Sequence, residues 1–475
     1  MTGPAGGTAV LRADVAVVGG GPAGMEAALW CARAGLAVVV LDEHEDLGGQ
    51  YFRRRHPAIR AVHGDHRPEG TALAEAVRAS GARVLTRHVV WGVDGRALLA
   101  HDEEGDRALR VEAGHVVVAT GAYERVLPFP GWELPGVVTP GLAMHLATMD
   151  RVAVGSRVLL AGSGPFLLPV ACALLEVGAR VVAVVEAGRP YRPGGPGVRG
   201  GVEALRHPAR LAELGGYLAR LARHRVPVLQ DRVVAEAVGG ARVARVRTVR
   251  TCGGGDREFE VDALAVGYGF RPATELVRLL GARTVVDPRT GDVVIAAGDD
   301  GATSVPGLYA VGELAGVAGV HAARLRGRLA AMSITAAAAG ETRADGRERE
   351  RLRRRLRRLV AFASLTGRLY PPPVEMVDTL PDEVHVCRCE AVPAGRVRAI
   401  ARTGLNDVHA VKGGSRAGMG LCQARECGTA LWRLAGASGS TAPLPARMPV
   451  RPVPTGVVAD MDRSGPADPA GPEQV

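Results

Sequence analysis

The chain has 475 residues and is 47% hydrophobic, enough for about three domains of ~150 residues with real cores. This excludes a disordered chain, a collagen and a small disulfide scaffold. The formal charge of +10 comes from 59 Lys+Arg against 49 Asp+Glu, with Lys412 as the single lysine. Because the arginines are spread along the chain and only 4% of residues are aromatic, the charge does not indicate a nucleic-acid-binding surface.

The sequence lacks the pattern of a secretory signal or a membrane-spanning helix. The first charged residue is Arg12, which follows a start rich in glycine and alanine. The uncharged run at 158–175 contains the sequence GSGP and a second proline, Pro169, which argue against a spanning helix. We therefore predict a cytoplasmic protein without a transmembrane segment, and peripheral association with a membrane stays open.

The first chemical motif is a glycine-rich turn between a predicted strand and a predicted helix. The apolar run DVAVV at 14–18 is followed by GGGPAG and then by a helical pattern. In this GxGxxG motif the first glycine permits a tight turn, the second lets the backbone approach a pyrophosphate, and the third lets helix and strand pack closely. The phosphates of a dinucleotide are expected at the helix N-terminus. The predicted binding residues are Gly19, Gly21, Pro22, Ala23 and Gly24.

Two acidic residues follow the second predicted strand, at 37–41, where the ribose hydroxyls of the dinucleotide need an acid. Asp42 and Glu43 both qualify. We prefer Glu43 because it precedes the sequence HEDLGGQ by the spacing usual in flavoproteins. Further candidate contacts in that sequence are Gly49 and Gln50.

Three later segments favour FAD over NAD as this dinucleotide. HVVVATGAYERVLPFPG at 115–131 is similar to the segment that closes a flavin domain, and VDALAVGYGFRP at 261–272 to the strand that returns from an inserted domain. GLYAVGE at 307–313 is similar to the last flavin motif, although a Glu replaces the usual Asp and its extra methylene shifts the carboxylate. The candidate flavin contacts are Thr120, Gly121, Gly312 and Glu313.

A second strand, glycine turn and helix lie at 156–186, which we interpret as an NAD(P)-type domain. Gly162 and Gly164 form the turn, and Glu186 ends the next strand, as in a nicotinamide nucleotide site. Leu167 stands at the third glycine position, where a bulky side chain hinders close packing of helix and strand. We therefore expect a degenerate domain and leave NAD(P) binding open.

Four of the seven cysteines lie close together in the sequence near its C-terminal end. Cys387 and Cys389 form C-x-C, and Cys422 and Cys427 form C-x4-C. Four thiolates can hold a 2Fe–2S cluster. Tetrahedral zinc could use the same ligands, but its sites mostly contain C-x2-4-C pairs, which C-x-C fits less well. We predict a 2Fe–2S cluster on these four cysteines, with zinc or simple buried cysteines as the alternatives.

Together these motifs predict an α/β flavoprotein with two dinucleotide-binding domains and a small C-terminal helical iron–sulfur domain. The Rossmann-like FAD domain is expected in two parts around the NAD(P)-type domain. An arginine-rich helical connector and a proline-rich tail, extended or disordered, flank the iron–sulfur domain. In chain order the predicted bounds are 12–135, 136–260, 261–340, 341–381, 382–436 and 437–475.

Taken in order, VVGGGPAG, LDEHEDLGGQ, VVVATGAYERVLPFPGW, LAGSGPFLLPVA, GYGFRP, LYAVGE and VCRCE…GMGLCQARECG resemble the flavoprotein α-type subunits of heteromeric amine-oxidising enzymes. This family includes opine oxidase, hydrogen cyanide synthase, D-hydroxyproline dehydrogenase and, more distantly, heterotetrameric sarcosine oxidase. The cysteine module is similar to the bacterioferritin-associated-ferredoxin (BFD) type of 2Fe–2S domain. Some relatives hold another adenine nucleotide where FAD is expected.

The resemblance implies a division of labour between subunits. A partner of the glycine-oxidase or D-amino-acid-oxidase type, with its own flavin, would oxidise the C–N bond of an amine, opine or imino acid. This chain would relay the electrons through FAD and the cluster to an acceptor such as a quinone or cytochrome. We predict no catalytic residue in this chain, because no Lys, Tyr or His lies in a recognisable amine-oxidation motif.

Two alternatives remain open at this point. The first is a self-sufficient NAD(P)H-dependent reductase of the ferredoxin-reductase type, against which Leu167 argues. The second is a non-catalytic scaffold that holds a nucleotide and stabilises the catalytic subunit. A disulfide reductase is disfavoured because GGQYFRRRHP, where such enzymes commonly carry a redox cysteine pair, contains no cysteine.

Overall fold

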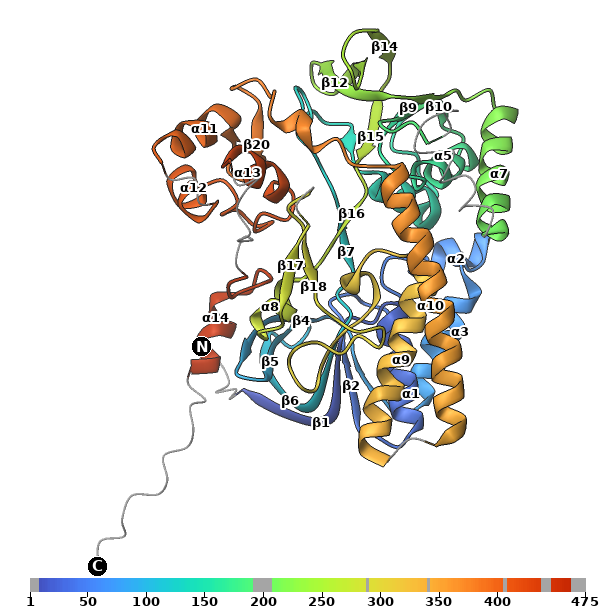
Figure 1. The fold of residues 1–475 in the computed structure, drawn as a ribbon, viewed down its shortest axis with the longest axis vertical. Coiled ribbons are helices and arrows are strands. Elements are labelled where there is room, and N and C mark those ends of the chain that lie inside the picture. Colours follow the sequence, from blue (N-terminus) through green and yellow to red (C-terminus); the bar gives the residue numbers. More distant parts are fainter. Residues whose placement is uncertain are drawn as a thin grey trace, which may run out of the picture.

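The computed structural model describes residues 8–190, 207–287, 290–339, 342–404, 408–436 and 446–462. These residues form two α/β domains, a hairpin of two long helices, a small helical module and a C-terminal segment that runs back over the first domain (Figure 1). The predicted fold class is confirmed.

The first domain is built on a sheet with parallel strands at its centre. Val15 and Val17 of β1 (Ala9–Val18) pack on one face of the sheet, and Ala16 and Val18 pack on the other. Both faces are therefore buried, as is usual for a parallel sheet. The strand order is β3 (Arg83–Leu85), β2 (Val38–Leu41), β1, β6 (Arg107–Val118), β5 (Ala97–Asp102) and β4 (His88–Asp94), with β19 (Leu308–Ala310) paired to β6.

Helices cover this sheet, and two of them extend as a long hairpin. α1 (Pro22–Arg33) packs against α9 (Val320–Ala339). α10 (Arg343–Leu369) follows α9 and buries Leu352 and Leu356 against it, so the apolar stripe of the arginine-rich connector is used within the chain (Figure 1). The remaining elements of this domain are α2 (Pro57–His63), α3 (Pro68–Ala79), α8 (Glu275–Leu279), η2 (Gly312–Ala315) and the pair β17 (Thr284–Val286) and β18 (Val293–Ile295).

A two-stranded connection of β7 (Ala122–Glu124) and β16 (Phe270–Pro272) joins the two domains (Figure 1). β15 (Ala263–Gly267) precedes β16 and pairs with the strands of the second domain. The predicted boundary at 261 is therefore too early, because the sequence of a strand does not reveal which sheet it joins.

The second domain contains a parallel sheet in the order β11 (Val228–Gln230), β10 (Arg180–Glu186), β9 (Arg157–Gly162), β15 and β8 (Val137–Val138). Its helical elements are α4 (Pro140–His145), η1 (Leu146–Asp150), α5 (Leu167–Glu176) and α7 (Pro208–Arg223). An antiparallel sheet of β12 (Arg232–Gly239), β13 (Val243–Arg250) and β14 (Arg257–Glu260) completes the domain.

The small module docks on the second domain and shares a hydrophobic core with it. The indole nitrogen of Trp132 donates a hydrogen bond of 2.7 Å to the carbonyl oxygen of His385. Phe129 and Trp132 from the second domain belong to the same buried cluster as Val386 and Leu431 from the module. The module and its approach comprise η3 (Val374–Val377), β20 (His385–Cys387), β21 (Val392–Pro393), α11 (Ala394–Arg402), α12 (Val408–Ser415) and α13 (Gly428–Leu434).

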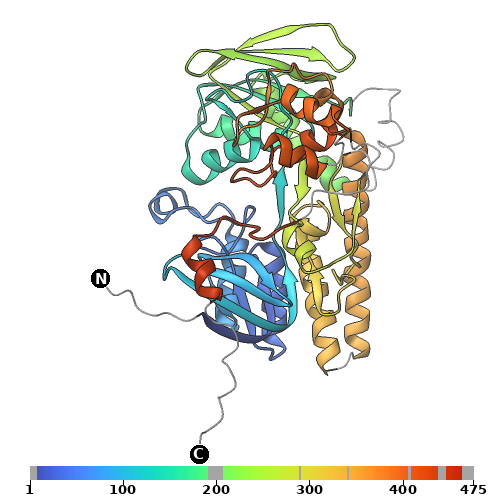
Figure 2. The same ribbon diagram turned by 90° about the vertical axis from the view of Figure 1, so that its left-hand side faces the viewer.

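Residues 446–462, here called the C-terminal strap, differ from the predicted extended or disordered tail. The strap includes α14 (Thr455–Asp462) and crosses the first domain (Figure 2). Val450 and Val457 are buried. A proline-rich segment can therefore be ordered when its apolar side chains pack into a hydrophobic core that other elements form. The rest of the predicted tail lies outside the described residues. Among the residues that the structure describes, no helix combines the length and apolar character that crossing a membrane requires.

Candidate nucleotide and cluster sites

The first glycine turn has the geometry of a phosphate-binding loop. Gly21 is the N-cap of α1, and no side chain caps the free N–H groups of that helix. A Cβ atom at Gly21 would meet only the Cα atom of Gly49, at 3.8 Å, so the space beside this backbone is open. A Cβ atom at Gly24 would lie 1.9 Å from the carbonyl oxygen of Gly19, which shows how closely helix and strand approach. The turn therefore fits a pyrophosphate.

The two acids after β2 have different partners. Asp42 is buried, and its carboxylate accepts hydrogen bonds from the backbone N–H groups of Gly20 and His44, at 2.5 and 2.8 Å. The side chain of Glu43 is 40% exposed and pairs with Arg451. Asp42 thus holds the loop, while the carboxylate of Glu43 makes none of these backbone contacts. Glu43 as the ribose ligand stays a prediction.

The other predicted flavin contacts lie around the same turn. Gly312 approaches it closely, since a Cβ atom there would lie 3.0 Å from the Cβ atom of Ala23. Gly49 is within reach of Gly21, and Gln50 is exposed at the surface.

Thr120 and Glu313 both hydrogen bond within the chain. The Thr120 hydroxyl donates to the carbonyl oxygen of Ala273 at 2.8 Å, and Gly121 after it has a φ of +77°. Oε1 of Glu313 accepts from the N–H groups of Ala318 and Gly319, and burial raises the pKa of this carboxyl. Both of these hydrogen bonds fall on Oε1, and Glu313 as a flavin contact stays a prediction.

The second glycine turn is engaged by its own chain. The carboxylate of Glu186 is buried and accepts from the N–H groups of Gly164 and Gly188, at 3.0 and 2.8 Å, and burial raises its pKa to about 7. The Ser163 hydroxyl donates to the carbonyl oxygen of Pro371 at 3.2 Å. The linker between α10 and the module therefore contacts this turn at Ser163, and Glu186 is bonded to the backbone of the turn. A Cβ atom at Gly164 would meet nothing within 4 Å, so the space beside this glycine is open.

The four module cysteines are free thiols that lie close to one another. Cys427 contacts Cys387 and Cys422, and Cys422 contacts Cys389. The Cys427 contact lowers the pKa of Cys387 to about 6 and that of Cys422 to about 5, and the N–H of Gly418 points at Cys387 Sγ at 3.4 Å. The donor set fits an iron–sulfur cluster. This fit rests on the chemistry of the four thiols, because within the described ranges neither they nor any other three His, Cys, Asp or Glu side chains are arranged to hold a metal ion.

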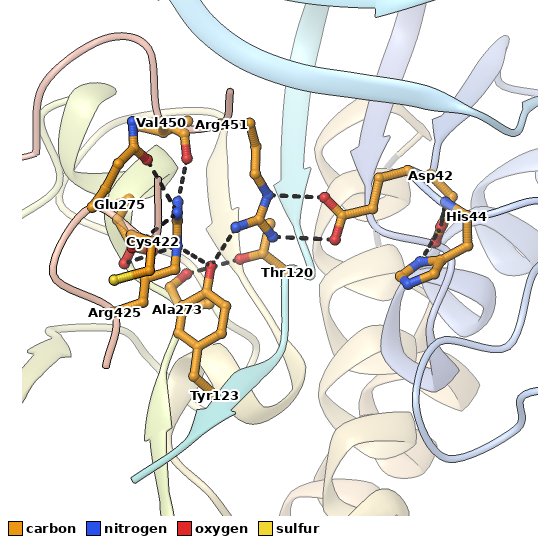
Figure 3. Close-up of polar contacts among 12 residues, drawn as sticks. Asp42, His44, Thr120, Tyr123, Ala273, Glu275, Cys422, Arg425, Val450 and Arg451 are labelled. Carbon is orange, nitrogen blue, oxygen red and sulfur yellow. Dashed lines mark hydrogen bonds and ion pairs between the residues drawn. The ribbon is translucent and has the colours of Figure 1, made fainter. Parts of the chain in front are cut away.

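A polar network between the module and the first domain was not predicted from the sequence. The hydroxyl oxygen of Tyr123 accepts hydrogen bonds from Arg425 Nε at 2.9 Å and from Arg451 Nη1 at 2.7 Å (Figure 3). Arg425 lies between Cys422 and Cys427, and Arg451 lies on the C-terminal strap. Arginine is so common in this sequence that its residue type gave no signal.

Comparisons with known proteins agree with these two sites. Residues 13–338 match the family model "Pyridine nucleotide-disulphide oxidoreductase", and residues 385–434, which include all four module cysteines, match "BFD-like [2Fe-2S] binding domain". The chain is 32% identical to one of the subunits of opine oxidase from Agrobacterium tumefaciens (strain Ach5), over 87% of this chain and 84% of that protein. It is also 32% identical to the HcnB protein of hydrogen cyanide synthase from Pseudomonas aeruginosa, over 92% and 96%.

Among solved structures, L-proline dehydrogenase from P. horikoshii superposes with a TM-score of 0.68 at 21% identity, over 95% of this chain and 80% of that one. This likeness supports the arrangement of the whole fold, from the first glycine turn to the module.

Proposed function

Because the chain belongs to the pyridine nucleotide-disulphide oxidoreductase family and ends in a BFD-like 2Fe–2S domain, we propose that it is the electron-relaying subunit of a heteromeric amine, opine or imino-acid dehydrogenase. It is a flavin-dependent oxidoreductase whose cofactors are FAD and a 2Fe–2S cluster. Electrons from C–N oxidation in a partner subunit would enter this chain and leave it for a quinone or cytochrome.

One structural observation is the main support for the proposed electron relay. Arg425, in the loop between Cys422 and Cys427, donates a hydrogen bond to Tyr123, two residues after Gly121 of the flavin segment (Figure 3). The loop that would hold two of the cluster ligands is thus fixed to the strand that leaves the flavin domain. The contact supports the relay because it holds the cluster loop beside the flavin domain.

The roles proposed for this chain's residues are binding and positioning. The first glycine turn would hold the pyrophosphate of FAD, Glu43 its ribose, and the four cysteines the iron atoms. The cofactors supply the redox chemistry when bound, and the protein sets their position and surroundings. None of these residues abstracts a proton from an amine.

The proposed partner is a catalytic subunit of the glycine-oxidase or D-amino-acid-oxidase type. The relatives support a heteromeric enzyme, since the matching proteins are single subunits of opine oxidase, hydrogen cyanide synthase and sarcosine oxidase. The NAD(P)H-dependent reductase is the weaker candidate, because the Ser163 hydroxyl of the second turn already donates its hydrogen bond to the carbonyl oxygen of Pro371 in the linker.

The proposal is tested by comparing the isolated chain with the complex. A protein of the glycine-oxidase type is co-expressed with the full chain, and dye reduction is measured with proline, an opine and sarcosine. Activity is expected only in the complex. If the isolated chain oxidises one of these amines as fast as the complex does, it has its own substrate site and the division of labour is wrong.

A further inference from the structure

The C-terminal strap brings an arginine to the first nucleotide site from the far end of the sequence. Its course is fixed just before that residue. Gln423 Nε2 donates a hydrogen bond to the carbonyl oxygen of Pro449 at 2.5 Å, and the N–H of Val450 donates to the carbonyl oxygen of Trp91 at 2.7 Å. Val450 is buried. Arg451 therefore leaves an anchored backbone.

Arg451 makes a two-point contact with the proposed ribose acid. Its Nε donates to Glu43 Oε2 at 2.8 Å, and its Nη2 donates to Glu43 Oε1 at 3.2 Å. A third hydrogen bond, from Nη1 to the hydroxyl oxygen of Tyr123, holds the other side of the guanidinium. The side chain of Arg451 remains 23% exposed, so a ligand can reach it.

The guanidinium has unused hydrogen-bonding capacity in this position. Arginine carries five N–H donors, and the contacts to Glu43 and Tyr123 use one on each nitrogen. The remaining two, on Nη1 and Nη2, have no protein acceptor among the described residues. A planar, permanently charged donor of this kind suits phosphate and ribose oxygens.

We propose that Arg451 is a nucleotide-binding residue of the first site, which donates hydrogen bonds to ribose or phosphate oxygens of FAD while it remains paired with Glu43. This inference rests on the proposed role of Glu43 as the ribose acid. The fixed backbone on the N-terminal side of Arg451 lowers the entropy that binding would otherwise cost.

The strap also links this site to the cluster module. Arg425 bonds to the carbonyl oxygen of Val450 and to the hydroxyl of Tyr123, which Arg451 also contacts (Figure 3). A nucleotide held by Arg451 therefore stabilises the strap against which the loop between Cys422 and Cys427 rests.

The test measures FAD binding to the full apo-chain by titration. Arg451→Ala is expected to weaken binding by roughly 10- to 100-fold, as for loss of a charge-assisted hydrogen bond. Arg451→Lys should recover part of the loss, because it restores the charge without the planar fork. The control is Arg447→Ala, which removes an exposed arginine from the same strap and should leave binding unchanged. If Arg451→Ala binds FAD as tightly as the parent chain, or more tightly, Arg451 only neutralises Glu43 and the proposal fails.

A double variant separates direct contact from an effect through Glu43. In a Glu43→Gln background, Arg451→Ala should still weaken FAD binding; if it has no further effect, Arg451 acts only by positioning Glu43. If a variant does not fold, the proposal can still be tested by measuring backbone hydrogen exchange in the parent chain with and without FAD. FAD should slow exchange at the backbone amides of Val450, Arg451 and Val453, and unchanged exchange at all three would overturn the proposal. Both measurements use FAD alone, so they stand apart from the amine-oxidation test.

Discussion

Ser163, in the second glycine turn, is hydrogen bonded to the carbonyl oxygen of Pro371, in the linker that leads from α10 to the cluster module. The turn has therefore kept the backbone of a dinucleotide site while serving as a support for the linker. Gly162 retains a φ of +141°, and a Cβ atom there would lie 1.7 Å from the carbonyl oxygen of Gly267. The fold therefore requires this glycine whether or not a nucleotide binds.

The first prediction is that NADH and NADPH do not reduce the bound flavin. Glu186 is already bonded to two backbone N–H groups and Ser163 to the linker, so a dinucleotide that used either side chain would have to displace those contacts. Anaerobic addition of either nucleotide in excess should leave the flavin absorbance unchanged, whereas dithionite should bleach it. Rapid bleaching by NADH would revive the self-sufficient reductase.

The second prediction contrasts two glycines of the first turn. Gly21→Ala should fold normally, since the new Cβ atom would meet only Gly49 Cα at 3.8 Å, yet it should weaken FAD binding by about tenfold or more because the methyl group occupies pyrophosphate space. Gly24→Ala should instead lower the melting temperature, because its Cβ atom would lie 1.9 Å from a carbonyl oxygen. Titration with FAD and thermal unfolding distinguish the two effects. Equal FAD affinity in Gly21→Ala and the parent would show that the phosphates bind elsewhere.

The two glycine turns could be predicted because their information is local. A strand, a GxGxxG or GSGP turn and a helix follow one another within about thirty residues, and the backbone requirements of the turn dictate the residue types. The four cysteines were equally visible, since few residues other than metal ligands recur at such spacing. The functional interpretation of both regions follows from the chemistry that those residue types allow.

The side-chain contacts that other parts of the chain make with these sites could not be predicted, because they join residues that are distant in the sequence. Glu43 and Arg451 are 408 residues apart, and Ser163 and Pro371 are 208 apart. Neither arginine nor proline is distinctive in this chain, which has 31 prolines and is rich in arginine throughout. Whether the linker reaches the second turn depends on where α10 ends against the second domain. That position is a property of the packed structure and cannot be read from the sequence.

The third prediction concerns the cluster ligands. Cys422→Ser combined with Cys427→Ser should remove the cluster, whereas Cys252→Ser, at an exposed cysteine outside the module, should keep it. The parent chain, purified without oxygen, should contain about two irons and about two acid-labile sulfides. In the complex, the double variant should retain fast reduction of the partner's flavin in stopped flow but turn over slowly with an external acceptor. Stoichiometric zinc without sulfide in the parent would contradict the cluster.

The last prediction concerns the docking of the module on the second domain. Trp132→Phe keeps most of a buried ring but removes the 2.7 Å hydrogen bond to the carbonyl oxygen of His385, two residues before Cys387. A lost hydrogen bond of this kind costs about 0.5–1.5 kcal/mol, and here the loss falls on the interface beside the first cluster ligand. Loss of iron to a chelator should therefore be several-fold faster in Trp132→Phe than in the parent.

Trp30→Phe is the matched control for that experiment. It also removes an indole hydrogen bond, of 3.1 Å to Glu26, but within α1 of the first domain and away from the module. Because this bond does not touch the interface, iron loss in Trp30→Phe should follow the parent. If both variants lose iron at the same raised rate, the cluster responds to general destabilisation of the chain. If neither changes, the Trp132–His385 contact does not hold the module in place, and its docking depends on the shared apolar core alone.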